Sequence, residues 1–391
     1  MIYLIIVIAS FLIGFNLSVI SGTLVFLEDD ILTTNFQQQI VVGSLLLGSF
    51  IGLICIASFI DWFGRRNSLV IGYALFFAGF ILFALSNSID GLVVGRLLCG
   101  AAVGSSSVVA PMFLAEISQK DQRGGFVSLH QLMITFGILI GYLSNYIVDG
   151  ALSWRAPYVL GASIAGMGLF AAVLSRRFHF THEPKRERGK ILVWGKDVQH
   201  SLFIGIVLAI LQQVCGINAI IYYAPALLIQ EGLASREVAL FASVGIGLVN
   251  FIMTIFAIYF IDRLGRRPLM IYGCFGMILG LGLAIFGYEQ VGILLYIASF
   301  ATSLGPVVWV YLSEIFPEKF RGRLLMVATF FNMLANAVVA FITLDAINLI
   351  GVTGVFSVFC AFLVFSIYFT LRFLPETKGE SLDQIERMFR K

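Results

Sequence analysis

Long apolar runs separated by short polar gaps follow one another from one end of the 391-residue chain to the other. Each run is long enough, at about 20 residues, to cross the roughly 30 Å hydrocarbon core of a bilayer. Lipid satisfies no main-chain N–H or C=O group, so only helices and closed barrels can span it. Barrel strands are shorter and alternate apolar with polar residues, a pattern absent here. The sequence therefore predicts an all-α integral membrane protein.

We expect twelve transmembrane helices in two pseudo-symmetric six-helix bundles. The predicted spans are residues 2–27, 37–60, 67–86, 91–116, 125–148, 156–177, 200–229, 238–261, 268–287, 291–316, 324–348 and 351–373. One substantial polar stretch separates the sixth span from the seventh. The predicted domains are an N-terminal bundle (1–178), a short cytoplasmic linker (179–199), a C-terminal bundle (200–373) and a cytoplasmic tail (374–391).

Composition narrows the classes of function. The chain is 59% hydrophobic and only 12% charged, whereas soluble domains carry about a quarter charged residues. The five cysteines and four histidines lack metal-ligand spacing, and no nucleophile–base pair is recognisable. We therefore expect no enzyme activity, no metal, no cofactor and no nucleic-acid partner. The expected partners are the lipid bilayer and a small molecule, with one chain as the working unit.

The basic residues predict how the chain is oriented. All but three of the 25 Lys and Arg residues fall on one side of the predicted spans, and the exceptions are Arg96, Arg155 and Arg236. The positive-inside rule makes the rich side cytoplasmic. With an even number of spans, both termini and the linker lie on that side. We expect a multi-pass protein of the plasma (cell inner) membrane.

A charged motif occurs once in each half. Asp61-Trp-Phe-Gly-Arg65-Arg66 returns as Asp262-Arg-Leu-Gly-Arg266-Arg267, and both lie in short polar gaps. A glutamate, Glu116 or Glu314, also precedes a second basic position, Arg123 or Arg321, by seven residues in each half. Two halves of similar build follow, as in transporters with internal repeats.

Further motifs give the chain a family resemblance. They are the doubled D-x-x-G-R-R, Val19-Ile20-Ser21-Gly22, Gln212-Gln213 with Gly216-Ile217-Asn218, Gly305-Pro306-Val-Val-Trp309, and Pro375-Glu376-Thr377-Lys378-Gly379. In this order and spacing the sequence resembles the sugar porter family of the major facilitator superfamily. The resemblance implies a central cavity that opens alternately to each face, in a family that includes glucose facilitators and proton-coupled sugar symporters.

The resemblance also implies a binding site for a sugar. Amide side chains donate and accept hydrogen bonds without the desolvation cost of a charge, and an aromatic ring can cover the apolar face of a pyranose. The implied sugar ligands are Gln131, Gln212, Gln213, Asn218, Asn250, Trp309 and Asn332. The implied lining residues are Ile134, Ile217, Tyr222, Tyr223, Phe300 and Asn336. Hydrogen bonding between helices is the alternative use of such amides, above all for Asn250 and Asn336.

One geometric condition follows for the seventh span. On a straight helix Gln213 and Asn218 would lie about 140° apart, so they meet one ligand only if the helix bends or unwinds at Gly216. Two departures from relatives leave the identity of the sugar open. Met333 stands where many relatives place a tryptophan, and Ala301 stands where glucose facilitators often carry a carboxylate.

Energy coupling is predicted from the first span. Proton-coupled relatives carry an aspartate where Gly14-Phe15-Asn16 has an amide, and Arg96 is its expected neighbour. An amide has no titratable proton, so the sequence predicts facilitated diffusion, or uniport. Three alternatives stay open: a proton–sugar symporter that uses another acid, a carrier for polyols or cyclic organic acids, and a sugar sensor. The sensor is disfavoured because only residues 374–391 follow the last span.

Salt bridges on the cytoplasmic side are predicted to form an inner gate that joins the halves while the cavity faces outward. The inner-gate residues are Asp61, Arg65, Arg66, Glu116, Arg123, Asp262, Arg266, Arg267, Glu314 and Arg321. Exposed pairs contribute about 0–1 kcal/mol each, but a partly buried network can bias a two-state equilibrium. The alternative is that these basic loops only fix orientation, which leaves the matched acids unexplained.

Overall fold

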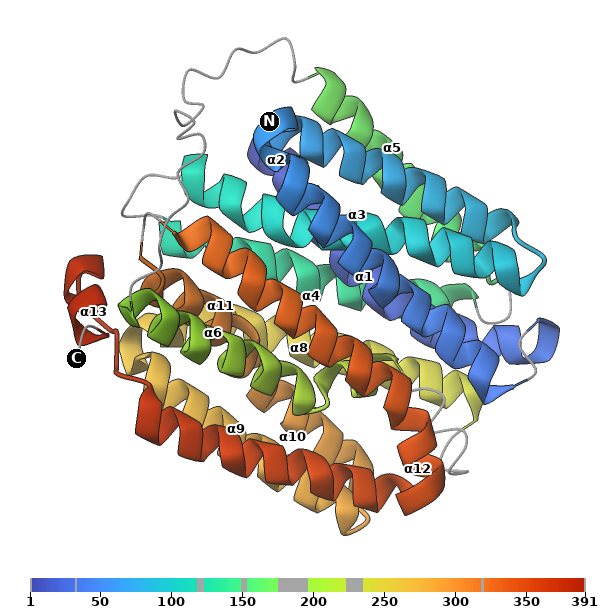
Figure 1. The fold of residues 1–391 in the computed structure, drawn as a ribbon. Coiled ribbons are helices and arrows are strands. Elements are labelled where there is room, and N and C mark those ends of the chain that lie inside the picture. Colours follow the sequence, from blue (N-terminus) through green and yellow to red (C-terminus); the bar gives the residue numbers. More distant parts are fainter. Residues whose placement is uncertain are drawn as a thin grey trace. The chain divides into compact units, whose positions relative to one another are not determined.

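The computed structural model describes residues 2–31, 34–117, 123–148, 153–174, 196–222, 235–317 and 320–389. All regular structure in these ranges is helical, which confirms the predicted fold class (Figure 1). The helices are α1 (Ile2–Asp30), α2 (Asn35–Leu85), α3 (Ile89–Ile117), α4 (Arg123–Val148), α5 (Ala156–Leu174), α6 (Lys196–Val214), α8 (Arg236–Leu264), α9 (Arg266–Ile285), α10 (Glu289–Thr302), α11 (Leu304–Ile315), α12 (Arg321–Phe373) and α13 (Leu382–Met388).

Two of these helices each contain two predicted spans. α2 has 51 residues and α12 has 53, and each changes direction at a glycine with positive φ, Gly64 (74°) or Gly351 (73°). Only glycine enters that backbone region without strain, so these positions join antiparallel spans with no intervening loop. Eleven helical segments of the described residues are long and apolar enough to cross a membrane, with α12 counted once. Within the described residues, each of the twelve predicted spans therefore lies mainly on helix.

Two spans are interrupted. In the seventh, α6 ends at Val214, Gly216 adopts φ 94°, and helix resumes over residues 217–222, as the spacing of Gln213 and Asn218 required. The tenth span, predicted as one helix over 291–316, breaks at Ser303 into α10 and α11. Pro306 accounts for this second break, because it has no N–H to donate to the carbonyl of Thr302.

The chain forms two compact units. Unit 1 comprises Met1–Glu183, Asn218–Leu248 and Ala340–Leu344, and unit 2 comprises Pro184–Ile217, Val249–Val339 and Asp345–Lys391. The chain thus passes from unit 2 to unit 1 directly after the break at Gly216. This grouping by contacts does not follow the predicted domain boundaries, which stay a prediction.

A stripe of small residues joins α1 to α4 in unit 1. A Cβ atom on Gly14 would lie 1.8 Å from the carbonyl oxygen of Ile134, and one on Gly137 would lie 2.1 Å from that of Phe11. Polar contacts flank the stripe, since Ser10 Oγ lies 2.7 Å from His130 Nδ1 and Asn145 Nδ2 donates to the carbonyl of Val19 at 2.9 Å. The two helices therefore pack with their backbones in contact.

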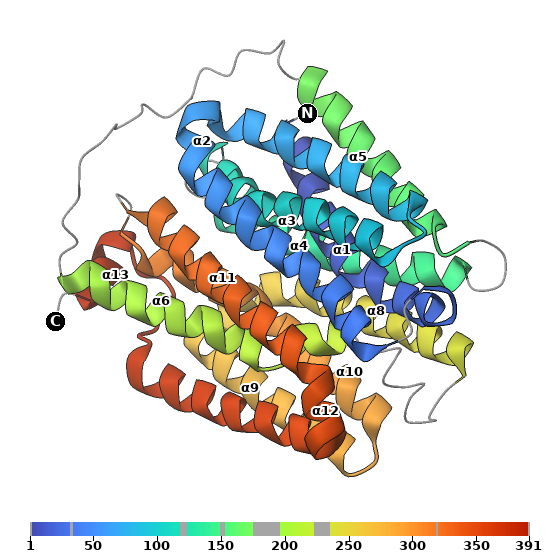
Figure 2. The ribbon, with the colours of Figure 1, turned by 45° about the vertical axis from the view of Figure 1, so that its right-hand side comes forward.

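The short helix α13 packs within unit 2. The side chains of Ile385 and Phe389 are buried, and the Phe389 ring lies 6.1 Å from the ring of His200 near the start of α6. Figure 2 shows α13 beside that end of α6. Ser381 and Gln384 form a capping box that starts the helix. The apolar spacing of the tail thus corresponds to a docked helix.

The α1–α4 contact gives a test of the fold. Gly14→Ala places a methyl group on a main-chain carbonyl that cannot move aside, so we expect a loss of about 1–3 kcal/mol of stability. Gly245→Ala in α8 is the matched control, because nothing lies within 4 Å of the Cβ it would add. Thermal unfolding of the detergent-solubilised protein should show a lowered Tm for the first variant only. Equal Tm values for the two variants would contradict the packing.

Candidate functional site

Three amide side chains meet in unit 2. Gln212 and Gln213 lie in the last turn of α6, Asn332 lies in α12, and all three are buried. The Gln213 Nε2 donates to Asn332 Oδ1 at 3.1 Å and to Gln212 Oε1 at 3.4 Å. The Asn332 Nδ2 donates to Gln212 Oε1 at 2.9 Å. We call these three residues the amide cluster.

The amide cluster is also bonded to the backbone around it. Gln212 Nε2 donates to the carbonyls of Leu304 (2.8 Å) and Gly305 (3.1 Å), and Asn332 Nδ2 donates to that of Ala209 (2.8 Å). Each of the three NH₂ groups has two hydrogens and two acceptors, so its donors are fully used. Spare capacity lies on oxygen, since Asn332 Oδ1 accepts one of these bonds and can accept two. A ligand that donates hydroxyl hydrogens suits such a surface.

The break after Val214 holds these amides in place. The carbonyl of Cys215 accepts from the Tyr296 hydroxyl at 2.9 Å, and that of Gln213 accepts from the N–H of Gly216 at 3.0 Å. A Cβ atom on Gly216 would lie 2.3 Å from the Phe359 ring. The break is therefore fixed by side chains from α10 and α12, which satisfy or cover the interrupted backbone. Sequence analysis did not identify Tyr296 or Phe359.

The other predicted sugar-site residues are distributed over both units. Unit 2 holds Ile217, Asn250, Phe300, Trp309 and Asn336, of which Trp309 is half-buried and the others are buried. Unit 1 holds Gln131, Ile134, Asn218 and Tyr222, of which only Tyr222 is fully buried. Tyr223 lies outside the described residues. The structure thus brings together three of the seven predicted ligands, all within unit 2, as the amide cluster.

The pair predicted for coupling is present in unit 1. Arg96 is 1% exposed, and its Nη1 donates to Asn16 Oδ1 at 2.5 Å and to the Asn16 carbonyl at 3.1 Å. Among the residues that the structure describes, its Nε and Nη2 have no hydrogen-bond partner. Among the described residues, no carboxylate forms an ion pair with Arg96. A buried cation is therefore held by a neutral side chain and a carbonyl, at a cost that a partner charge would otherwise offset.

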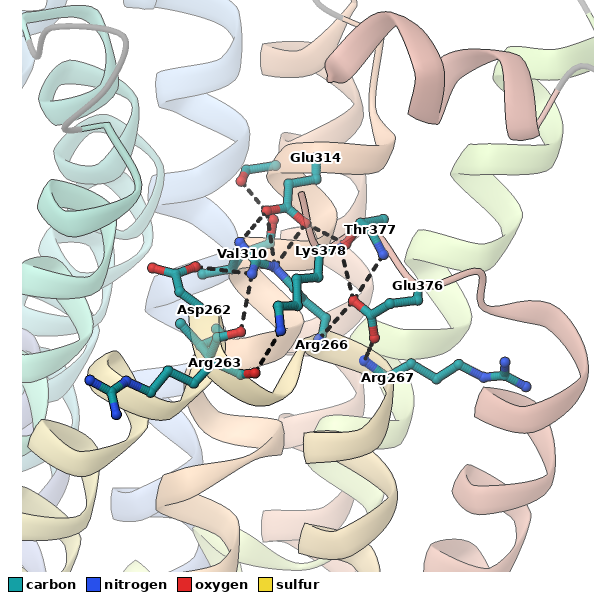
Figure 3. A network of polar contacts seen from close by, with 11 residues as sticks. Asp262, Arg263, Arg266, Arg267, Val310, Glu314, Glu376, Thr377 and Lys378 are labelled. Carbon is teal, nitrogen blue, oxygen red and sulfur yellow. Dashed lines mark hydrogen bonds and ion pairs between the residues drawn. The ribbon is translucent and has the colours of Figure 1, made fainter. Parts of the chain in front are cut away.

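The second-half members of the predicted inner gate form a network at the junction of α8, α9 and α11 (Figure 3). Arg266 Nη2 lies 2.7 Å from Glu314 Oε1, with both side chains less than 20% exposed. Arg266 Nη1 lies 3.0 Å from Asp262 Oδ1, but that carboxylate is 75% exposed. The pair with Glu314 is the stronger one, because water screens it less.

The segment after α12 completes this network. Glu376 accepts from the N–H groups of Arg266 (3.0 Å) and Arg267 (2.9 Å), which places a carboxylate at the N-terminus of α9. Opposite charge at a helix N-terminus is stabilising. Thr377 Oγ1 donates to Glu314 at 2.7 Å, and Lys378 Nζ donates to the carbonyl of Arg263 at 2.6 Å. The motif Pro375–Gly379 contained these residues, but sequence analysis gave them no role.

The first-half members are only partly visible. Arg65 and Arg66 follow the bend at Gly64 and are half-buried. The side chains of Asp61, Glu116 and Arg123 lie outside the described part of the structure. In the second half, Arg321 Nε donates to the Phe316 carbonyl at 3.2 Å. The gate as a connection between the halves stays a prediction.

Comparison with known proteins agrees with the motifs and the fold. The family model described as "Sugar (and other) transporter" matches residues 2–188 and 175–389. The D-xylose transporter of Levilactobacillus brevis is 32% identical over 428 residues, which cover 97% of this chain and 93% of the relative. The galactose–proton symporter of Escherichia coli (strain K12) is 32% identical over 426 residues, which cover 97% and 92%.

The architecture matches a solved structure as well. The proton:xylose symporter XylE bound to 6-bromo-6-deoxy-D-glucose superposes with a TM-score of 0.83 at 28% identity, covering 99% of this chain and 98% of that one. These relatives are transporters rather than enzymes. The chain belongs to the sugar porter family of the major facilitator superfamily and is a multi-pass membrane carrier for sugars.

Proposed function

We propose that this carrier moves a neutral monosaccharide, a hexose or a pentose, across the plasma membrane by alternating access and without coupling to protons. The observation that supports uniport is the contact between Asn16 and the buried Arg96. A proton-coupled cycle needs a group that binds and releases a proton in this low-dielectric region, and an amide cannot do so. Both termini face the cytoplasm in this proposal, and one chain suffices for transport.

Symport is the second candidate, because relatives of this chain include a galactose–proton and an arabinose–proton symporter. It would require a different acid to take the place of the missing aspartate. A polyol substrate is a further possibility, since a probable polyol transporter of Arabidopsis thaliana is 30% identical over 433 residues. Sugars and polyols share the neutral hydroxyl groups that amide oxygens accept from.

In the proposed binding mode, a sugar hydroxyl donates to Asn332 Oδ1 in the amide cluster and the Trp309 ring covers an apolar sugar face. The pattern of donors supports this, because the NH₂ groups of Gln212, Gln213 and Asn332 already have acceptors in the protein. The remaining ligands predicted from the sequence would complete the site. No charge takes part, so a neutral guest replaces water without leaving an ion unpaired.

Transport by the wild-type protein should be independent of a pH gradient. In proteoliposomes, labelled sugar should equilibrate without accumulating, and a protonophore should leave the initial rate unchanged. Asn16→Asp should make the rate depend on pH, because it adds a titratable carboxylate beside Arg96, whose Nε and Nη2 can receive it. Asn16→Ser is the neutral control and should stay insensitive to pH. Accumulation by the wild type that a protonophore abolishes would refute uniport.

Sugar binding should depend on the amide cluster. Gln213→Met keeps the length of the side chain and removes its hydrogen bonds. We therefore expect the free energy of sugar binding to weaken by about 1–3 kcal/mol, which raises the Kd roughly 5- to 150-fold. Gln199→Met is the control, since it lies on the same helix about 21 Å away. Calorimetric titration with a panel of hexoses and pentoses measures the effect. Equal Kd values for both variants would exclude Gln213 as a ligand.

The two carboxylates that pair with Arg266 should differ in importance. Glu314→Gln weakens the less exposed pair, and in our proposal it disfavours the outward-facing state, so the half-saturation for external sugar should rise several-fold. Asp262→Asn removes the exposed pair and should change it less than twofold. Zero-trans influx into oriented vesicles gives both values. A larger effect for Asp262→Asn would contradict this assignment.

A further inference from the structure

The two parts of the seventh span, before and after its break, belong to different compact units. Residues up to Ile217 belong to unit 2, whereas Asn218–Leu248 belongs to unit 1 together with α1 and α4. The second part of this span contains the predicted ligand Asn218 and the lining residue Tyr222. Whatever holds this part against unit 1 therefore also sets the position of two candidate sugar-site residues.

Side chains from α1 and α4 contact the described residues of this segment, 218–222 and 235–248. The Tyr142 hydroxyl donates to the main-chain carbonyl of Ile221 at 2.7 Å. The ring of Tyr146 lies 5.6 Å from that of Phe241, and the Arg236 guanidinium lies 3.8 Å above the Phe26 ring. Only the first of these contacts binds the short helix 217–222 itself.

The bond from Tyr142 meets a need that the sequence creates. In a continuing helix the Ile221 carbonyl would accept from the N–H of residue 225, and residue 225 is a proline, which has none. A carbonyl left unsatisfied in a bilayer is costly, and Ile221 is 3% exposed. The Tyr142 hydroxyl therefore supplies a donor to a carbonyl that a helix continued through residue 225 would leave unsatisfied.

The surroundings of Tyr142 suit this task. Its side chain is 1% exposed, and a Cβ atom on Gly247 of α8 would lie 2.9 Å from its Cδ2. The Tyr142 ring thus packs against Gly247, while its hydroxyl bonds to Ile221 in the same segment. The contact joins two neutral groups, so one water molecule can replace each partner when the two separate.

We propose that Tyr142 is a positioning residue of the transport cycle, whose hydroxyl holds the helix 217–222, with Asn218 and Tyr222, against α4 and must release it when the carrier opens to the outside. This inference rests on the proposed alternating-access function. The bond exists in one state and is broken in the other, so its loss shifts the balance between the two states toward the open one.

Tyr142→Phe tests the proposal, because it keeps the ring beside Gly247 and removes only the hydroxyl. We expect about 2- to 10-fold faster amide hydrogen exchange over residues 217–222 and a fall of similar size in the half-saturation for external sugar. Tyr146→Phe is the matched control, since Tyr146 contacts Phe241 through its ring, and it should leave both values unchanged. Unchanged exchange and half-saturation in Tyr142→Phe, or equal changes in both variants, would overturn the proposal.

A second variant tests whether the proline at position 225 is the reason that the Ile221 carbonyl needs the Tyr142 hydroxyl. Pro225→Ala supplies a main-chain N–H that a helix continued through residue 225 would donate to the Ile221 carbonyl, so in our proposal Tyr142→Phe should have a much smaller effect on exchange in that background. A fully additive effect would overturn the role assigned to Pro225. Hydrogen exchange needs no sugar and no transport. If exchange responds as expected while reconstituted wild-type protein moves no monosaccharide, the tyrosine contact stands and the proposed function fails.

Discussion

In a bilayer, every main-chain group that a helix break frees must find a partner inside the protein. Two main-chain carbonyls in the described part of the interrupted seventh span follow this rule. The carbonyl of Cys215 accepts from the hydroxyl of Tyr296, and further along that of Ile221 accepts from Tyr142. The break at Gly216, which a shared ligand of Gln213 and Asn218 would require, is therefore stabilised by tyrosines on two other helices that bond to the main chain around it.

The same constraint explains what the sequence could and could not predict. Span positions follow from the length of apolar runs, and Gly216 marked a break because two candidate ligands on one helix needed it. The break at Ser303 was missed, although Pro306 removes a donor there, because the apolar run continues through it. The bond between Gln213 and Asn332 joins residues far apart in the chain, and its geometry depends on how α6 and α12 are rotated.

The predicted inner gate includes a contact that the repeated sequence motif could not predict. The doubled motif predicted salt bridges between the two halves on the cytoplasmic side, and the ion pairs that Arg266 forms with Asp262 and Glu314 lie within the second half. Glu376 has no place in the duplicated pattern, because it follows the last span, yet it accepts the first two N–H groups of α9. A repeated motif predicts only the charged residues that occur in both halves. The carboxylate at this helix terminus is a feature of the second half, so it could be found only from the structure.

Arg96 is a buried cation that donates to the amide side chain and the main-chain carbonyl of Asn16. Without an aspartate, a buried guanidinium costs stability, and replacement by an apolar residue would be expected if it served only proton exchange. Here Arg96 also donates to the main-chain carbonyl of Asn16 and so fixes α1 to α3. That contact is independent of any proton. A positioning role for the cation is compatible with uniport, and it accounts for an arginine that faces an amide in an otherwise neutral site.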